Sequence, residues 1–335
     1  MSQNASQNAG QNAGRNASRA GNGVLRVLPW GSGGLGSQDH QRDMYLPAFR
    51  EHPGFRVVEP ADAADAPEAG GLGDAIAETG AQVVCVCAPA DERADRIVEA
   101  LQAGCHVLAD KPMALELRDA ERVAAVAAET GRVCMPAHHH RFGAAVQAAR
   151  GALAGGRVGL PWNVQADFLV DGGDPCPQGE LVNFGLYPVD VVSSLTGQAV
   201  RRVHALAGRE PGRSAVLLLD HEHGLTSTIT VGRLHGTAGA PGMALHRYRV
   251  SGSGGVMDVD ANRPGATVRT AAGTRTAWHA PGTVARMLTA LHTAIVTGRP
   301  PEAGPADALA ALRVTAAAAR SLALGAPVAL DPSEV

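Results

Sequence analysis

Residues 105–112 read Cys105-His106-Val107-Leu108-Ala109-Asp110-Lys111-Pro112, a short apolar run that ends in two charged residues and a proline. We interpret the run as a strand with Lys111 at its carboxyl end. In an open α/β sheet the carboxyl ends of the strands border the crevice in which ligands bind, and Lys111 would offer a fixed ammonium donor there. We therefore predict that Lys111 is a catalytic residue.

A glycine-rich stretch lies upstream of this run. Residues 31–36 read Gly-Ser-Gly-Gly-Leu-Gly, follow a predicted strand and match the pattern G-x-G-x-x-G. Glycines let the backbone approach a pyrophosphate closely, and the next helix would add donors and a favourable dipole at its amino terminus. Pro29 and Trp30 interrupt the usual strand-to-loop sequence, and extra residues within 37–47 delay the helix. The stretch predicts a phosphate site, with a plain loop as the alternative, and its candidate residues are Gly31, Gly33, Gly34 and Gly36.

Apolar strands and Ala-rich helices alternate over the first part of the chain. The predicted strands cover residues 24–28, 55–58, 82–87, 106–108 and 132–135, and helices are predicted at 91–103 and 115–130. Strands that are separated by helices indicate a parallel, doubly wound sheet. We therefore predict a dinucleotide-binding Rossmann domain at residues 24–142.

The rest of the chain reads differently. Residues 1–23 repeat Gln-Asn-Ala with Ser and Gly, a composition that builds no core and predicts a disordered leader. Strand-like runs follow in series at residues 162–170, 202–207, 215–219, 226–231, 248–251 and 256–259. Such a series predicts an α+β domain at 143–283 with a large, mainly antiparallel open sheet. Helices at 284–297 and 306–324, within a C-terminal part at 284–335, are predicted to pack back near the first domain.

Composition excludes two classes of partner. The 335 residues are 45% hydrophobic and 18% charged and carry a formal net charge of -3, which gives no basic field for nucleic acid or an anionic membrane surface. The five cysteines are an odd number, and four of them lie in or beside apolar runs, so we interpret them as reduced, mostly buried thiols. Together with the lack of a secretory apolar segment, they predict a cytoplasmic protein.

The second predicted strand ends near two acids, either of which could bind the ribose of an adenosine. Asp62 lies just beyond the strand and is preferred, while Glu59 lies inside it, before a proline, and is the second choice. No Arg or Lys follows closely to hold a 2′-phosphate. NAD is therefore favoured over NADP.

Three motifs in order resemble the Gfo/Idh/MocA oxidoreductases over nearly the whole chain after the leader. They are residues 104–112, which are similar to the family's G-x-H-V-x-x-E-K-P with Asp110 for Glu, His139-His140-Arg141-Phe142, and residues 179–190, which resemble G-G-x-x-x-D-x-G-x-H-x-x-D. The resemblance implies an enzyme that binds NAD or NADP, with Pro89 and Asp110 beside the cofactor. It also implies a homodimer or homotetramer formed through the open sheet.

Two positions depart from the family's usual pattern. Asn183 stands where the family usually has Asp, and Tyr187 stands where many members have His. The resemblance is to the branch that carries Tyr, which includes proteins similar to glucose-fructose oxidoreductase, dihydrodiol dehydrogenase and the sugar-nucleotide 3-ketoreductases. An amide cannot accept a proton or hold a negative charge, but Asn183 could orient a substrate hydroxyl.

Hydride transfer chemistry supports a pair made by Lys111 and Tyr187. Oxidation of a secondary alcohol removes the hydroxyl proton, and reduction of the ketone delivers it. We predict that the ammonium of Lys111 lowers the pKa of the Tyr187 phenol and leaves Tyr187 to carry the proton. If the segment is helical, Asn183 and Tyr187 share a face, and Pro188 is best tolerated in a first helical turn.

The histidine run at 138–140 does not predict a metal site, because adjacent side chains on an extended segment point to opposite faces. We expect His139, His140 and Arg141 at the rim of the substrate pocket, with satisfied or surface histidines as the alternative. Asp190 is expected to brace the substrate end or to be a solvated helix acid.

These observations predict an oxidoreductase that moves hydride between NAD(P) and a ring carbinol or ketone carbon. The expected substrate is a small sugar, cyclitol or sugar nucleotide. Two alternatives stay open: an enzyme of the same fold that uses NAD for a net non-redox reaction such as glycoside cleavage, and a catalytically silent regulatory protein that binds cofactor or sugar.

Overall fold

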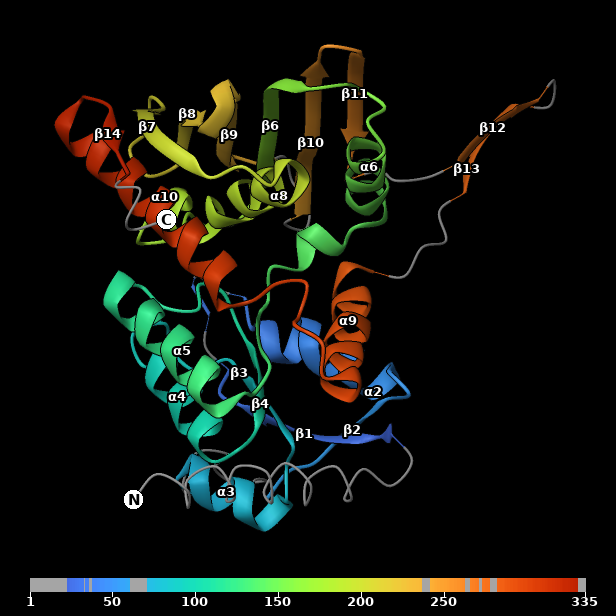
Figure 1. The fold of residues 1–335 in the computed structure, drawn as a ribbon, viewed down its shortest axis with the longest axis vertical. Coiled ribbons are helices and arrows are strands. Elements are labelled where there is room, and N and C mark those ends of the chain that lie inside the picture. The colour runs from blue at the N-terminus through green and yellow to red at the C-terminus, as the bar shows by residue number, and fades with distance from the viewer. Residues whose placement is uncertain are drawn as a thin grey trace, which may run out of the picture.

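The computed structural model describes residues 23–32, 34–35, 38–60, 71–236, 242–262, 266–270, 273–277 and 282–330. Two sheets, one above the other in Figure 1, form the body of the molecule. The predicted leader, apart from Gly23, lies outside the described residues.

The lower sheet has five parallel strands in the order β2-β1-β3-β4-β5. They are β1 (Leu25–Trp30), β2 (Phe55–Val57), β3 (Val83–Val86), β4 (His106–Ala109) and β5 (Cys134–Pro136). The helices between them are α2 (Leu46–Glu51), which continues a π-helical turn η2 (Gln41–Tyr45), α3 (Leu72–Thr79), α4 (Arg93–Gln102) and α5 (Leu117–Thr130). The predicted doubly wound parallel sheet is confirmed.

Strand β1 continues through Pro29 to Trp30, two residues beyond the predicted end at residue 28. Val27 accepts from Val58 on the β2 side, so Pro29, two residues on, also directs its nitrogen to that side. The pairing of β2 with β1 reaches only Val27. A residue without an N–H is therefore tolerated at Pro29, since the β2 pairing ends before it.

The upper sheet has seven strands in the order β11-β10-β6-β9-β8-β7-β14. They are β6 (Pro161–Asp171), β7 (Val200–Ala207), β8 (Ser214–His221), β9 (Thr226–Leu234), β10 (Gly242–Gly252), β11 (Gly255–Asp260) and β14 (Val328–Ala329). The β6–β9 pair is parallel and the other pairs are antiparallel. The predicted mainly antiparallel sheet is confirmed. A separate hairpin, β12 (Ala266–Thr270) and β13 (Gly273–Ala277), extends away from the body (Figure 1).

Helices cover one face of the upper sheet and link it to the lower one (Figure 1). They are η3 (His139–Phe142), α6 (Ala144–Ala154), α7 (Glu180–Phe184), α8 (Leu186–Thr196) and α10 (Pro305–Leu324), and a further helix is α9 (Thr283–Thr297). Helix α10 buries Val314 in the core of the upper sheet and Ala308 in that of the lower one. Helix α9 packs instead on the lower domain, where Met287 and Leu291 are fully buried. Burial of each such side chain contributes about 1.5–3 kcal/mol. The domain boundaries at 142 and 283 stay predictions.

Candidate active site

A cavity of about 490 Å³ lies where the carboxyl edge of the lower sheet meets the upper sheet. Its walls come from the loop after β1, η2, the end of β4, η3, β6 and the loop after it, α7, α8, β9 and β10. The lining residues are Leu35, Gln38, His40, Met44, Lys111, His139, His140, Phe168, Val170, Gly173, Asp174, Cys176, Asn183, Phe184, Tyr187, Arg233, Gly242 and Met243. The structure thus brings together Lys111, Asn183, Tyr187, His139 and His140, five of the predicted site residues.

Lys111 is the only lysine in the 335-residue sequence, and its side chain is almost fully buried. It follows β4, as predicted, and its Nζ donates to Asn183 twice: to the backbone oxygen at 3.0 Å and to Oδ1 at 2.7 Å. Burial lowers the pKa of Lys111 to about 8, against the opposing charge of Asp110. An ammonium has three N–H donors, so one is left for a ligand.

Tyr187 lies in the same cavity, with its ring stacked 5.6 Å from that of Phe168 and in edge contact with His140 at 4.5 Å. Its pKa is raised well above 10, chiefly by burial and then by the charge of Asp110. The lowered phenol pKa that we expected is therefore not what the structure shows. The Nζ of Lys111 lies 5.3 Å from the Tyr187 ring and donates to Asn183, and its charge does not outweigh desolvation of the phenol.

The segment that carries Asn183 and Tyr187 is helical but broken. Helix α7 ends at Phe184 and α8 begins at Leu186, and Gly185 joins them. A methyl group at Gly185 would lie 2.4 Å from the carbonyl oxygen of Leu181, so the junction requires glycine. Pro188 occupies the first turn of α8, where a missing N–H leaves no helical hydrogen bond unmade.

A second charged group lies behind Asn183. Glu180 is fully buried, and its Oε2 accepts from Asn183 Nδ2 at 3.1 Å. Its Oε1 accepts from Arg233 Nε at 2.6 Å and from the backbone N–H of Cys176 at 3.0 Å. The sequence motif contained Glu180, but nothing in the sequence paired it with Arg233, 53 residues away.

Asp110 is fully buried and holds three side chains of the lower domain. It accepts from His40 Nδ1 at 2.9 Å and from the Tyr45 hydroxyl at 2.7 Å, and Arg93 Nη2 lies 3.2 Å away. Burial alone would raise the pKa of Asp110, but the His40 hydrogen bond and the Arg93 charge outweigh it and hold that pKa at about 2. This carboxylate fixes His40, which lines the cavity, beside Lys111. Sequence reasoning missed His40 and Tyr45.

His139 and His140 line the cavity as neutral side chains. Burial lowers the pKa of His139 to about 3 and lowers that of His140 well below its usual range. His139 hydrogen-bonds to Thr283 at 2.7 Å, and His140 packs edge-on against His246 at 4.8 Å. Neutral imidazoles offer a donor and an acceptor without charge, which suits the hydroxyl groups of an uncharged ligand.

Arg141 and Asp190 pair with each other instead of lining this cavity. Arg141 donates from Nε to Asp190 at 2.9 Å and makes further bonds through Nη2 to Asp190 and Asp307. Asp190 also accepts from His138 Nδ1 at 2.7 Å. The two residues therefore tie η3 to α8 and to the start of α10, and the pair joins the two domains.

The cofactor candidates that the structure describes lie along the carboxyl edge of the lower sheet. Gly31 has a positive φ of 78°, and a methyl group there would lie 2.8 Å from the nitrogen of Ala88, so the loop after β1 needs glycine at this approach. Pro89 helps to line a hollow of about 130 Å³ at the ends of β1 and β3, and Gly34 precedes the cavity residue Leu35. Two hollows thus follow this edge, which fits an elongated dinucleotide. Glu59 lies 3.8 Å from Arg50 on the surface. The candidates Gly33, Gly36 and Asp62 lie outside the described residues.

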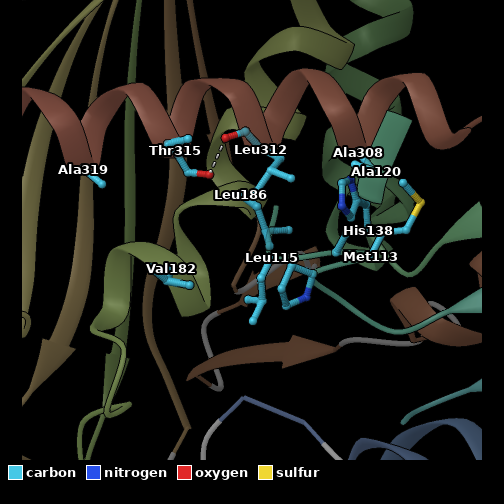
Figure 2. Close-up of a pocket in the computed structure, with 13 residues that line it drawn as sticks. Met113, Leu115, Ala120, His138, Val182, Leu186, Ala308, Leu312, Thr315 and Ala319 are labelled. Atoms are coloured by element: carbon cyan, nitrogen blue, oxygen red, sulfur yellow. Dashed lines mark hydrogen bonds between the residues drawn. The ribbon is translucent and has the colours of Figure 1, made fainter. Parts of the chain in front are cut away.

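A second cavity, of about 200 Å³, lies beneath α10 (Figure 2). The helix directs three side chains toward Val182 and Leu186, namely those of Leu312, Thr315 and Ala319. Among the described residues that line it, His138 is the only titratable side chain, and it is bound to Asp190. The cavity is apolar and holds no pair of groups for proton transfer, so the cavity at Lys111 is the better candidate for chemistry.

No helix of the part of the chain that the structure describes has the length and apolar character of a membrane span.

The fold and the Lys111 cavity define a class of protein. Its members have a Rossmann-type domain followed by an open sheet, and the open sheet covers the carboxyl edge of the parallel sheet. Residues 38–138 match the Gfo/Idh/MocA model, described as an oxidoreductase family with an NAD-binding Rossmann fold. This part of the chain is thus similar to the Gfo/Idh/MocA family.

Curated relatives match parts of the chain. A D-glucoside 3-dehydrogenase of Escherichia coli is 30% identical over 139 residues, which cover 37% of this chain and 38% of the relative. A dTDP-3,4-didehydro-2,6-dideoxy-α-D-glucose 3-reductase of Actinomadura kijaniata is 31% identical over 171 residues, 45% of this chain and 49% of the relative. The matches thus span less than half the length of these relatives.

Solved structures match the fold over most of the chain. An aldose-aldose oxidoreductase from Caulobacter crescentus, complexed with glycerol, has a TM-score of 0.73 at 23% identity and covers 92% of this chain and 100% of its own. A scyllo-inositol dehydrogenase from Lactobacillus casei, with bound NAD(H) and scyllo-inositol, has a TM-score of 0.72 at 14% identity and covers 91% and 99%. At these identities the likeness concerns the fold.

Proposed function

We propose that this protein is an NAD(P)-dependent oxidoreductase that moves hydride between nicotinamide and a ring carbinol or ketone carbon of a sugar, cyclitol or sugar nucleotide. One observation carries the proposal: the chain's single lysine is buried in a cavity at the carboxyl edge of the Rossmann sheet, together with Tyr187. Burial of an ammonium lowers the stability of the folded protein. A catalytic site that needs a cationic hydrogen-bond donor explains why Lys111 is buried.

The bound nicotinamide supplies the hydride or accepts it. In this proposal Lys111 donates its remaining N–H to the reacting oxygen and stabilises negative charge on it. Tyr187 holds the proton. In the reductive direction the phenol O–H bond breaks and the proton moves to the carbonyl oxygen as hydride reaches the carbon, and in oxidation the proton returns to the phenolate. Asn183 orients Lys111.

The cavity walls favour an uncharged polyhydroxylated ring. His139, His140 and Asn183 offer neutral hydrogen-bonding groups, while Phe168 and Met243 offer apolar surface to the C–H face of a ring. Dehydrogenases and reductases of glucosides and sugar nucleotides are among the relatives, which supports the same substrate class.

The residues of the carboxyl edge would hold the cofactor. Gly31 and Gly34 lie where the pyrophosphate would pass, Pro89 lines the hollow at the ends of β1 and β3, and Asp110 fixes His40 beside the nicotinamide end. Gly33, Gly36 and Asp62 complete the proposal from the sequence. NAD is favoured over NADP.

The uncovered face of the upper sheet is the proposed contact between copies of the chain. Leu206 on β7 and Leu218 on β8 are 51% and 43% exposed, and both point to the face opposite α8. A homodimer or homotetramer would bury them. Light scattering on the wild type and on Leu218→Asp tests this, since a monomeric wild type or an unchanged oligomer in the variant would contradict it.

Activity is tested by thermal-shift screening with NAD, NADP and a panel of sugars, cyclitols and sugar nucleotides, followed by absorbance at the nicotinamide band. We expect a shift with a cofactor and a change in absorbance with at least one substrate. No shift with either cofactor would contradict the cofactor site. Substrate turnover without net NADH would favour glycoside cleavage instead, and binding without turnover would favour a regulatory protein.

A further inference from the structure

We propose that Glu180, backed by Arg233, is a positioning residue that fixes which way the amide of Asn183 faces, so that Asn183 presents its oxygen to Lys111. The proposal rests on the proposed function in treating Lys111 as catalytic, but the geometry that carries it does not depend on any substrate.

The donors and acceptors along this chain allow one arrangement. Lys111 is donor-only and lies on one side of the Asn183 amide, while a carboxylate, which is acceptor-only, lies on the other. The amide must therefore give its oxygen to Lys111 and its NH2 group to Glu180. Reversal of the amide would place two donors together at one end and two acceptors at the other.

Glu180 itself is fixed from its far side. Its carboxylate accepts from the Arg233 guanidinium and from the backbone N–H of Cys176, so all three neighbours of Glu180 are donors. Arg233 is held in turn by the carbonyl of Gly172 at 2.6 Å and lies over the Phe184 ring at 5.2 Å. Only an acceptor-only side chain at position 180 satisfies all of these donors.

This arrangement explains how an amide serves where the family usually has an acid. The carboxylate is not at position 183, next to Lys111, but at Glu180, and the Asn183 amide lies between them. Arg233 pairs with Glu180 and compensates its negative charge. Lys111 keeps two oxygen acceptors without a carboxylate in direct contact. The ammonium is thus held in place, and its charge is left for the ligand.

The first test replaces the acceptor-only group by an amide of the same shape, Glu180→Gln. Arg233 and Cys176 will take the Gln oxygen, so its NH2 group will face Asn183 and turn that amide around, with its own NH2 group toward Lys111. We expect kcat/KM to fall about 10- to 100-fold, the effect of an unsatisfied buried donor. The matched control is Glu210→Gln, which alters an exposed Glu–Arg pair outside the cavity and should leave kcat/KM unchanged.

The second test restores the order of donors and acceptors. In Glu180→Gln/Asn183→Asp the Gln NH2 group donates to the new carboxylate, which accepts from Lys111. We expect kcat/KM to return to within about tenfold of the wild type. If the double variant is no more active than Glu180→Gln, or if Glu180→Gln keeps wild-type kcat/KM, the proposal is wrong.

A readout without substrate separates this proposal from the proposed function. Because the chain has one lysine, labelling with lysine carrying ¹³C at Cε gives one lysine resonance, whose pH titration reports the pKa of Lys111. We expect that pKa to fall in Glu180→Gln and to rise above the wild type in the double variant, where a carboxylate contacts Lys111. An identical titration in all three proteins would overturn the proposal, whether or not any sugar is turned over.

Discussion

Replacement of Lys111 by Met should make the protein more stable while removing its activity. Met has a similar length and no charge, so it relieves the burial of an ammonium. The pKa of Lys111 is lowered by burial from its ordinary 10.5 to about 8. Between these values the unfolded chain binds more protons than the folded protein, so wild-type stability rises with pH across that window.

The size of the effect follows from these two pKa values. Lys111 lowers the wild-type free energy of unfolding by ~3 kcal/mol at pH 7 and by ~1.4 kcal/mol at pH 9.5. Lys111→Met removes this destabilisation but also loses the hydrogen bonds to Asn183, which offsets part of the increase in stability. We expect the free energy of unfolding of Lys111→Met to exceed that of the wild type by about 2 kcal/mol at pH 7.

Urea unfolding of both proteins at pH 7 and pH 9.5, followed by circular dichroism, measures this difference. The other titrating groups are common to both proteins and cancel in the comparison. The reasoning is refuted if Lys111→Met is less stable than the wild type at pH 7, or if the difference between the two proteins stays the same at both pH values.

Three further substitutions have distinct expected outcomes. Tyr187→Phe should reduce kcat by about 100-fold, because the proton carrier is lost, with little change in cofactor binding by thermal shift. Asp190→Asn should destabilise the protein by about 3 kcal/mol in urea, because Arg141 keeps a buried charge without its main partner, and a loss under 1 kcal/mol would contradict this. Gly31→Ala should weaken NAD binding about tenfold or more by calorimetry, because the methyl group meets Ala88, and unchanged affinity would contradict it.

Much of the fold was predictable from local sequence pattern. Apolar runs of strand length alternate with Ala-rich helices, and glycines end the helices, as at Gly131 and Gly325, which both adopt positive φ. The predicted first strand ended before Pro29, whereas β1 continues past it. The proline is tolerated because the pairing of β1 with β2 ends at Val27, and the sequence alone does not show where that pairing ends.

The site was predictable only in part. Lys111, Asn183 and Tyr187 belong to motifs that can be recognised in the chain, and the structure places them in one cavity. The side chains that support the site are distant from it in the sequence. His40 hydrogen-bonds to Asp110, 70 positions away, and no local pattern indicates such a pairing. The count of one lysine in the sequence was a signal that pointed to Lys111 without any motif.

The prediction that Lys111 lowers the pKa of the Tyr187 phenol was wrong for a physical reason. Proximity of an ammonium lowers a phenol pKa only if the Coulomb attraction exceeds the desolvation of the phenolate, and the sequence does not report burial. In the folded protein Tyr187 is buried and Lys111 is directed at Asn183, so desolvation prevails.

The most direct test of the central claim is nicotinamide absorbance with the purified wild type and with Lys111→Met, each saturated with NAD or NADP and offered the substrate that gives the highest rate in the panel. The account predicts hydride transfer by the wild type and a loss of at least about 1,000-fold in kcat/KM for Lys111→Met, with cofactor affinity preserved. Wild-type rates in the variant would contradict it.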